Sequence, residues 1–494
     1  MQWERRWSCV IAVALAGCGS DGPGEGESDT SLADELNLPG FVIDGAAAGD
    51  RILAEPCGDI NGDGLEDLAV EATREGRLVA YVVYGKDDEG QVELAELEAG
   101  GAGGLTFDAG ARTTYSDDRL ELVGVGDVNG DGFDDLVVAP RHSDAGSATL
   151  LPGGPAYPAL VNYAHLTAEG GTATFTVSGD YFGGSGVEPV RIGDINGDGF
   201  EDVGLIGHGG LSDSFQVAFG GATIESRTQD QLREGAGGFA IQYVERAHVL
   251  GPADINGDGI EDLVVADFGR YRFGRVDVVV LFGGADLGVD SPILVEDYSP
   301  PPLPGFLVAL TDYYVTQFLG GAAGRDINGD GLDDIAIDDG GEGAVFVVFG
   351  KTDGESVLLP EALGDRGFRI EHGDLPAGES PYDLDRRLTM IPDLNGDGRD
   401  EIVLQSRSTE GEPSQAYVIY GKEDTAPVAL SDVAAGVGGY LVNDWPEGGY
   451  LGDLIGWAAI GGGAARDLVL VDRDASPSGE ASGRAYVLFD VPGR

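Results

Sequence analysis

DINGDGLED, residues 59–67, is the first of six closely similar acidic segments in this 494-residue chain. The others are DVNGDGFDD (127–135), DINGDGFED (194–202), DINGDGIED (254–262), DINGDGLDD (326–334) and DLNGDGRDE (393–401). Their first residues lie 60 to 72 positions apart, a spacing that indicates a repeated structural unit. Each copy has an acidic or amide side chain at positions 1, 3, 5 and 9 and glycine at positions 4 and 6.

This pattern of oxygen-bearing side chains suits a hard divalent cation. Calcium takes six to eight oxygen ligands from carboxylates, amides and backbone carbonyls, and glycine lets the chain fold closely around the ion. Without an ion, several carboxylates within a few ångströms would repel one another. We therefore expect about six bound Ca²⁺ ions, one in each loop. Magnesium is less well suited because it prefers an octahedral shell with retained waters, and metal-free acidic turns are the remaining alternative.

The expected ligands are the residues at positions 1, 3, 5, 7 and 9, where position 7 contributes its backbone carbonyl. Loop by loop they are Asp59, Asn61, Asp63, Leu65, Asp67; Asp127, Asn129, Asp131, Phe133, Asp135; Asp194, Asn196, Asp198, Phe200, Asp202; Asp254, Asn256, Asp258, Ile260, Asp262; Asp326, Asn328, Asp330, Leu332, Asp334; and Asp393, Asn395, Asp397, Arg399, Glu401. The sixth loop departs from the others because a glutamate stands at position 9.

Position 12 separates these loops from EF-hands, which also begin with DxNxDG. An EF-hand requires a bidentate glutamate there. The residues at position 12 are all apolar: Val70, Val138, Leu205, Val265, Ile337 and Leu404. Each loop instead leads into a short β-branched run bounded by turn residues, so it is expected to connect two β-strands.

The segments between the loops complete a unit of four strands. Most units contain a strand that ends in an aromatic residue and glycine, at Gly85, Gly220, Gly283, Gly350 and Gly421. A further strand begins near Gly40, Gly104, Thr172, Gly238, Gly305, Gly367 and Gly438, which is one copy more than the acidic loops. The seventh loop falls at 459–467, where Ala459 and Gly463 replace the aspartates of positions 1 and 5. We expect this loop to be metal-free.

A four-stranded unit of this length buries too little surface alone, so neighbouring units must stack. Seven such units predict an all-β, seven-bladed β-propeller of four-stranded blades over residues 40–494. The chain starts with a lone strand at 40–44 and ends with the third strand of the last unit at 485–489. The N-terminal strand is therefore expected to complete the last blade and to remove its open edge.

The loops and the aromatic-glycine strand ends resemble the FG-GAP repeat of integrin α-subunit propellers. Val138, Ala139 and Pro140 also match the final part of that motif. The resemblance covers about 40–490 and implies calcium in hairpin loops between the first two strands of a blade. It also implies that ligands or partner subunits meet the opposite face. Integrins carry calcium in only three or four blades, and the integrin legs and transmembrane helix have no counterpart in this sequence.

The N-terminal region reads as an export signal. Arg5 and Arg6 precede an apolar stretch that is too short to span a bilayer, and the tetrad ending at Cys18 resembles a bacterial lipobox. We expect residues 1–18 to be a lipoprotein signal peptide whose Cys18 is lipidated, and residues 19–39 to be a flexible acidic tether. The protein is then anchored by lipid at the outer membrane or surface of a bacterium. An ordinary secretory signal with an incidental cysteine is the alternative.

The charge balance limits the partners. With 29 basic and 87 acidic residues, the net charge of −58 disfavours nucleic acids and anionic membranes. Aromatic residues recur in loops expected on the face opposite the acidic loops, at Tyr115, Tyr181, Tyr243, Tyr313, Tyr382 and Trp445. They are candidates for binding an unidentified protein or glycan, although they would equally fill the ring centre and cover the blade cores. We expect a monomer that contacts the membrane only through its lipid.

The preferred function is a non-enzymatic adhesion or ligand-binding module. The main alternative is a calcium-dependent polysaccharide lyase or hydrolase on the same scaffold, and a structural envelope scaffold is the third possibility. No GxSxG, Walker or zinc motif is present, and the five histidines follow no repeated spacing. The basic residues best placed for such catalysis are Arg141, Arg270, Arg272 and Arg275. We expect Asp474, which begins a DxSxS sequence, to lie in a turn.

Overall fold

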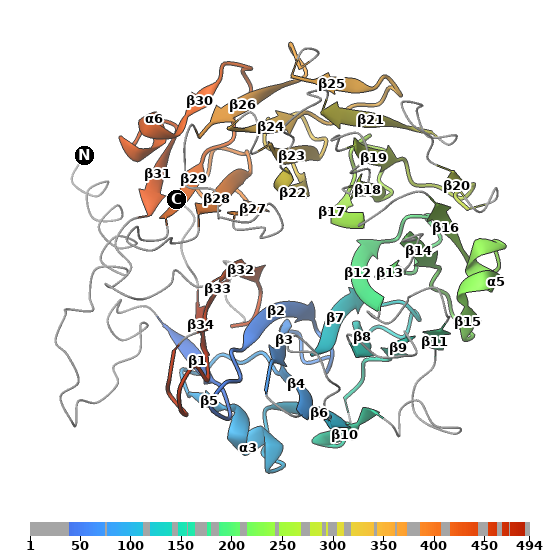
Figure 1. Ribbon diagram of the computed structural model, residues 1–494, viewed down its shortest axis with the longest axis vertical. Coiled ribbons are helices and arrows are strands. Elements are labelled where there is room, and N and C mark those ends of the chain that lie inside the picture. Colours follow the sequence, from blue (N-terminus) through green and yellow to red (C-terminus); the bar gives the residue numbers. More distant parts are fainter. Residues whose placement is uncertain are drawn as a thin grey trace.

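Seven β-sheets surround a common axis in the computed structural model (Figure 1). The structure describes residues 39–74, 77–111, 119–140, 147–155, 157–163, 175–178, 187–207, 215–242, 247–267, 277–288, 293–294, 304–310, 318–339, 343–360, 363–372, 386–406, 415–442, 453–461, 467–473 and 475–489. The expected signal peptide and nearly all of the expected tether lie outside these ranges and stay predictions.

Each sheet is an antiparallel blade whose first strand is nearest the axis. The first blade runs outward through β2 (Leu53–Gly58), β3 (Asp67–Ala72), β4 (Arg77–Val83) and β6 (Gly104–Ala111). The second contains β7 (Leu120–Gly126), β8 (Asp135–Pro140), β9 (Ser147–Leu151) and β11 (Phe175–Ser178). The third contains β12 (Val187–Gly193), β13 (Asp202–Gly207), β14 (Phe215–Ala218) and β16 (Gly238–Gln242).

The remaining blades repeat this order. The fourth contains β17 (Ala247–Ala253), β18 (Asp262–Asp267), β19 (Asp277–Leu281) and β21 (Gly305–Leu310). The fifth contains β22 (Phe318–Arg325), β23 (Asp334–Asp339), β24 (Ala344–Val348) and β26 (Gly367–Glu371). The sixth contains β27 (Arg386–Ile391), β28 (Glu401–Ser406), β29 (Gln415–Ile419) and β31 (Gly439–Val442). The seventh contains β32 (Asp453–Ala458), β33 (Asp467–Asp472), β34 (Arg484–Leu488) and β1 (Gly40–Asp44).

The predicted seven-bladed propeller of four-stranded blades is confirmed, and six sheets carry an addition. A strand of two or three residues from the following unit joins the outer edge in parallel orientation. These strands are β5 (Val92–Glu93), β10 (Leu160–Asn162), β15 (Arg227–Thr228), β20 (Ile293–Leu294), β25 (Val357–Leu359) and β30 (Val428–Ala429). Three of them lead into one-turn helices, α3 (Leu94–Glu98), α5 (Gln229–Arg233) and α6 (Leu430–Ala434). Such short elements lack the period-2 pattern by which a longer strand is recognised.

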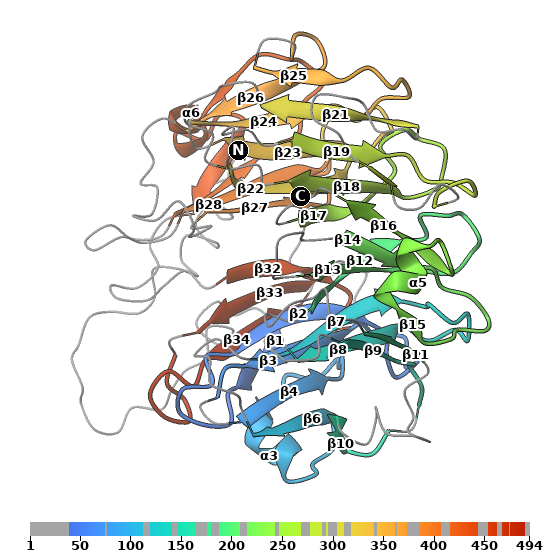
Figure 2. The same cartoon turned by 45° about the vertical axis from the view of Figure 1, so that its right-hand side comes forward.

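The hydrophobic cores lie between neighbouring blades, which stack face to face (Figure 2). One core joins Phe41, Ile43 and Val487 of the seventh blade to Leu68 and Tyr81 of the first. Comparable clusters join each further pair of blades from the first to the sixth. Both faces of a blade are therefore buried, which explains why the second strands of the first three blades are largely apolar.

The N-terminal strand closes the ring, as predicted. β1 pairs antiparallel with β34 from Gly40↔Leu488 to Asp44↔Arg484, and the two strands lie side by side in Figure 1. The Arg484 guanidinium donates to both carboxylate oxygens of Asp44, at 2.5 and 2.9 Å. The chain termini of the propeller are thus joined by a full strand ladder and a buried ion pair. No helix in the described ranges is long and apolar enough to cross a membrane.

Candidate metal centres

Each acidic loop connects the first and second strands of its blade, as expected. The first loop follows β2 at Gly58 and ends at Asp67, the first residue of β3. The same placement holds for the loops before β8, β13, β18, β23 and β28. Because equivalent strands run in equivalent directions, all six loops lie at the same end of the ring. Each brings its five expected ligand positions together within one tight turn.

The carboxylate at position 1 organises the turn. Asp59 accepts hydrogen bonds from the backbone N–H groups of Gly62, Asp63 and Gly64, at 2.7, 3.1 and 2.8 Å. The first aspartates of the other five loops accept the equivalent three bonds. This carboxylate therefore holds the loop closed around itself, and it does so identically in six blades.

Positions 3 and 5 make local bonds that orient their oxygen atoms. Asp63 accepts from the N–H of Leu65 at 2.9 Å, and the equivalent bond recurs in every loop. Asn61 donates its amide to Asp67 at 3.3 Å. In the third, fourth and fifth loops the asparagine oxygen also accepts from the N–H of position 5. The side chains of positions 1, 3 and 5 are thereby held on the loop and not extended into solvent.

Position 9 is a buried carboxylate held by two backbone donors. Asp67 has no exposed surface and accepts from Ile60 at 3.0 Å and from Gly85 at 2.8 Å. Gly85 is the glycine of the aromatic-glycine strand end, and Gly153, Gly220, Gly283 and Gly350 make the same bond in their blades. These glycines are required because a Cβ would collide with the backbone carbonyl of position 8, which is 2.6 Å away at Gly85.

Burial raises the pKa of every position-9 carboxyl group. It reaches about 7 for Asp67, Asp135 and Asp262 and about 8 for Asp202 and Asp334. For Asp67, Asp135 and Asp202, the carboxylates at positions 1 and 5 of the same loop raise the pKa further. Three acidic groups therefore converge closely enough to repel one another, which is the electrostatic environment that a bound cation would relieve.

The glycines at positions 4 and 6 serve different purposes. Gly62 and Gly64 both have positive φ, 78° and 91°, which disfavours other residues. A Cβ on Gly64 would meet nothing within 4 Å, whereas a Cβ on Gly62 would lie 2.2 Å from the ring of Phe133 in the next blade. Glycine at position 4 thus also makes room for the neighbouring loop.

The donor set fits an oxygen-loving ion, although the carboxylates alone do not form a metal site. Within the described ranges, no group of three or more Asp, Glu, His or Cys side chains is arranged to hold a metal ion. Two of the five expected donors in each loop are an amide and a backbone carbonyl, and the carboxylates already accept backbone hydrogen bonds. The Oδ1 atom of Asp59 already accepts two of these bonds, but its Oδ2 atom accepts one and retains a second lone pair. The all-oxygen set suits calcium better than a transition metal.

The sixth loop keeps this geometry despite its glutamate. Glu401 is fully buried and accepts from the N–H of Leu394 at 2.5 Å and from the side chain of Asn395 at 2.7 Å. Burial raises its pKa to about 8. The Arg399 side chain donates to the carbonyl of Asn328 in the preceding blade at 3.2 Å, and its guanidinium also lies 3.7 Å from Asp397, the position-5 residue of its own loop.

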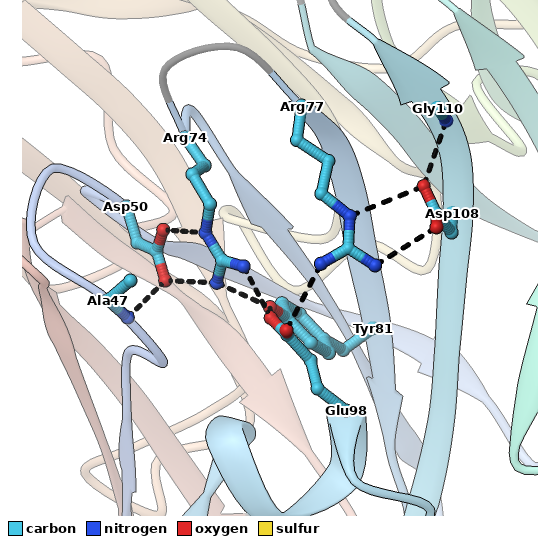
Figure 3. Close-up of polar contacts among 8 residues, drawn as sticks. All are labelled: Ala47, Asp50, Arg74, Arg77, Tyr81, Glu98, Asp108 and Gly110. Carbon is cyan, nitrogen blue, oxygen red and sulfur yellow. Dashed lines mark hydrogen bonds and ion pairs between the residues drawn. The ribbon is translucent and has the colours of Figure 1, made fainter.

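A second group of charged side chains lies in the first blade (Figure 3). Arg74 donates to both oxygens of Asp50, at 2.7 and 2.9 Å, and lies 2.6 Å from Glu98. Arg77 pairs with Glu98 at 3.2 Å and with Asp108 at 2.9 Å. Asp50 belongs to the connection between β1 and β2, so this cluster fastens the closing strand to the first blade.

Tyr81 completes the cluster without supplying a reactive group. Its hydroxyl donates to Glu98 at 2.5 Å and accepts from Arg74 at 3.0 Å. Burial and the bond to Glu98 raise the pKa of this hydroxyl well above its ordinary value. A protonated tyrosine among fully paired ions stabilises the fold and is a poor base.

Between the first two blades, two glutamates share one arginine. Arg119 lies 3.2 Å from Glu71 of β3 and 3.2 Å from Glu121 of β7. Burial, with smaller contributions from Glu121 and Glu55, raises the pKa of Glu71 to about 8, although Arg119 opposes the increase. One guanidinium thus balances only part of the acidic charge at this site.

The three lysines of the chain, Lys86, Lys351 and Lys422, each follow a strand-end glycine and are held in turns. Each pairs with the aspartate two residues later, as in Lys86–Asp88 at 3.0 Å, Lys422–Asp424 at 2.9 Å and Lys351–Asp353. Each also lies over a phenylalanine of an outer strand, with Lys351 4.4 Å from the ring centre of Phe306.

Several predicted residues lie outside the described ranges. These are Cys18, the aromatic candidates Tyr115, Tyr181, Tyr243, Tyr313, Tyr382 and Trp445, the arginines at 141, 270, 272 and 275, and Asp474. The predictions that rest on them stay predictions. Cys57 is buried as a free thiol, and burial raises its pKa well above the ordinary value.

Comparison with known families agrees with the loop geometry. The model of the FG-GAP repeat family matches residues 121–151, which cover most of β7, the second acidic loop, β8 and β9. The protein carries an FG-GAP repeat within a seven-bladed propeller. Phosphatidylinositol-glycan-specific phospholipase D of Mus musculus is 27% identical over 194 residues, or 37% of this chain. The match spans 20% of that relative's length. An FG-GAP propeller is compatible with a ligand-binding or adhesion module.

Sequence analysis missed one class of residues in the FG-GAP propeller. Position 8 is acidic in all six loops: Glu66, Asp134, Glu201, Glu261, Asp333 and Asp400. The structure shows that at least three of these carboxylates contact the preceding blade. The recurring acid at position 8 is visible in the sequence. The pattern within one loop does not reveal, however, that this side chain contacts the neighbouring blade.

Proposed function

We propose that this protein is an exported, lipid-anchored, calcium-binding propeller that acts as an adhesion or ligand-binding module for a protein or glycan. The observation that carries the proposal is the sixfold recurrence of one loop geometry. In every copy the first carboxylate is enclosed by three N–H groups, and the last is buried against two or more donors. A geometry kept in six blades of divergent sequence indicates one shared ligand.

Calcium has a plain structural purpose in such a ring. The chain contains three cysteines, of which Cys57 is a buried free thiol, so the propeller is not stapled by disulfides between its blades. An ion that binds only the folded state stabilises it by about 2.7 kcal/mol at a hundred times its Kd. Six such ions would contribute a large part of the net free energy of folding. They would also reduce the net charge of −58, leaving a strongly acidic surface.

The partner is proposed to meet the face opposite the acidic loops, where loop aromatics are expected. We propose a binding module and not an enzyme, because the described basic side chains are committed to structural contacts. Arg74, Arg77, Arg119 and Arg484 are ion-paired, and the three lysines are held in turns. The activity named for the mouse relative is not assigned to this chain, since the match covers a fifth of that protein.

The decisive experiment is calcium titration by calorimetry on residues 19–494, which lack Cys18, together with thermal unfolding with and without chelator. About six ions and a large loss of stability in chelator are expected. Asp258→Ala should remove one ion, because it deletes the position-5 ligand of the fourth loop. Asp87→Ala, at an exposed acid outside the loops, removes the same charge and should leave the stoichiometry unchanged. Absence of calcium binding, or equal effects of both variants, would refute the proposal.

A further inference from the structure

The position-8 carboxylates link neighbouring loops. We propose that each of Asp134, Glu201, Glu261, Asp333 and Asp400 positions the first ligand of the calcium loop in the preceding blade, so that calcium affinity at one loop depends on the next. This inference rests on the calcium binding proposed above. It assigns a role to residues that are not themselves expected to touch the ion.

The contact is clearest between the first two blades. The N–H of Asp59 donates to a carboxylate oxygen of Asp134 at 2.7 Å, across 75 residues of sequence. The N–H of Asp134 in turn donates to the carbonyl of Asp59 at 3.2 Å. Both peptide groups that flank the Asp59 side chain are thus held by one residue of the second blade. This fixes the backbone from which the position-1 carboxylate projects.

The same pair of bonds recurs twice on the far side of the ring. Asp333 accepts from the N–H of Asp254 at 2.9 Å and donates to its carbonyl at 3.1 Å. Asp400 accepts from the N–H of Asp326 at 3.3 Å and donates to its carbonyl at 3.0 Å. In all three cases the acceptor is an aspartate at position 8 and the donor is the first ligand of the preceding loop.

Two of the three glutamates at position 8, Glu201 and Glu261, reach the same place by packing. The N–H of Glu201 donates to the carbonyl of Asp127 at 3.2 Å. Its side chain lies against Gly126, the residue before Asp127, where an added Cβ would come within 2.6 Å of the Glu201 chain. Glu261 lies against Gly193 in the same way, at 2.7 Å. The longer side chain therefore covers the residue that precedes the loop.

Two further contacts join the same pairs of loops. The side chain at position 7 covers the position-4 glycine of the preceding loop, as Phe133 covers Gly62. The residue after the glycine that follows the third strand donates to the position-2 carbonyl of the preceding loop, as Gly154 does to Ile60 at 2.7 Å. Equivalent bonds join Gly221, Gly284, Lys351 and Lys422 to their preceding loops. Each of the first five loops is thus supported at positions 1, 2 and 4 by the next blade.

A loop held in its folded conformation therefore also stabilises the folded conformation of the acidic loop in the preceding blade. Residues that orient metal ligands through hydrogen bonds commonly change metal affinity by 10-fold or more when they are removed. The position-8 carboxylate is therefore expected to raise calcium affinity at the loop of the preceding blade by holding the backbone of its first ligand.

The test is a double-mutant cycle read by calcium calorimetry. Asp134→Ala should weaken one site by about ten-fold, and that site should be the first loop, not the loop that contains residue 134. In an Asp63→Ala background, which lacks the first site, Asp134→Ala should then have no further effect. In an Asp131→Ala background, which lacks the second site, its effect should persist. Asp134→Asn keeps an acceptor oxygen and should restore most of the affinity.

Glu66→Ala is the matched control. Glu66 also occupies position 8, but its N–H donates to Ala459 of the seventh loop, which lacks the aspartates of positions 1 and 5. This variant should leave all calcium affinities unchanged. If the wild-type protein binds no calcium, the proposed function fails. If it binds calcium but Asp134→Ala changes nothing, or its effect survives the Asp63→Ala background, the coupling alone is refuted.

Discussion

Arg484→Met should destabilise the pairing of β1 with β34, which closes the ring. Arg484 lies in β34 directly opposite Asp44 of β1, and the two side chains are 10% and 3% exposed. Asp44 also accepts a hydrogen bond from the side-chain amide of Gln91 at 2.5 Å. Removing the guanidinium leaves a buried carboxylate with one neutral donor and with Glu93 nearby.

The expected loss follows from the burial of the pair. Breaking a buried ion pair by removing one partner costs about 3 to 5 kcal/mol, because the remaining charge stays desolvated. Replacing both members by apolar residues of similar size removes that penalty, so Asp44→Leu with Arg484→Met should lie within about 1 kcal/mol of wild type. Arg366→Met is the control, since its pair with Glu355 is exposed and is expected to contribute less than about 1 kcal/mol.

The free energy of unfolding should be measured by chemical denaturation at a fixed calcium concentration and again in chelator. The single variant should lose several kcal/mol in both, whereas the double variant and the control should not. A loss of less than about 1 kcal/mol for Arg484→Met, or a double variant as unstable as the single one, would refute the view that this ion pair secures the closing strand.

Two other predictions concern single residues. Gly62→Ala should lower the unfolding free energy by about 1 to 3 kcal/mol more than Gly64→Ala, since both have positive φ but only the first collides with Phe133; equal losses by denaturation in chelator would contradict this. Glu71→Gln should change the pH dependence of stability. Burial raises the pKa of Glu71 in the folded protein to about 8, from an ordinary value of 4.5. Its contribution to the free energy of unfolding is therefore fully present below pH 4.5 and is lost as the pH rises through 8. The variant should therefore gain about 1 to 3 kcal/mol on wild type between pH 5 and pH 9, and parallel curves would show that Arg119 keeps Glu71 ionised throughout.

The architecture was predictable because the sequence repeats it. Six acidic loops at similar spacing and seven copies of the outer strand indicated seven units, and the extra strand at residues 40–44 indicated how the last unit is completed. Strand pairing within a blade joins residues close in sequence, so the local pattern contains it. The short parallel strands such as β5 and β10 were missed because two or three residues carry no recognisable periodicity.

The candidate site was predictable only in part, for a related reason. Position 9 was expected to be a ligand, and the structure adds that it is buried and held by the strand-end glycine, as Asp67 is by Gly85. The contact of Asp134 with Asp59 and the pair of Asp44 with Arg484 span 75 and 440 residues. Such contacts arise from ring geometry, which brings together residues whose sequence relation has no fixed spacing.

The seventh blade differs from the others in a way that fits its position in the ring. Its loop keeps the backbone contacts with the first blade, since Glu66 and Lys86 donate to Ala459 and Ile460 at 2.9 and 3.0 Å. It has nevertheless lost the aspartates of positions 1 and 5. This blade is the one assembled from both ends of the propeller, and its last strand is held by a ladder and a buried ion pair. The proposed coupling therefore links the loops of the first six blades and does not continue around the whole ring. In the seventh blade, the pairing of β1 with β34 and the ion pair of Asp44 with Arg484 take the place of a calcium site.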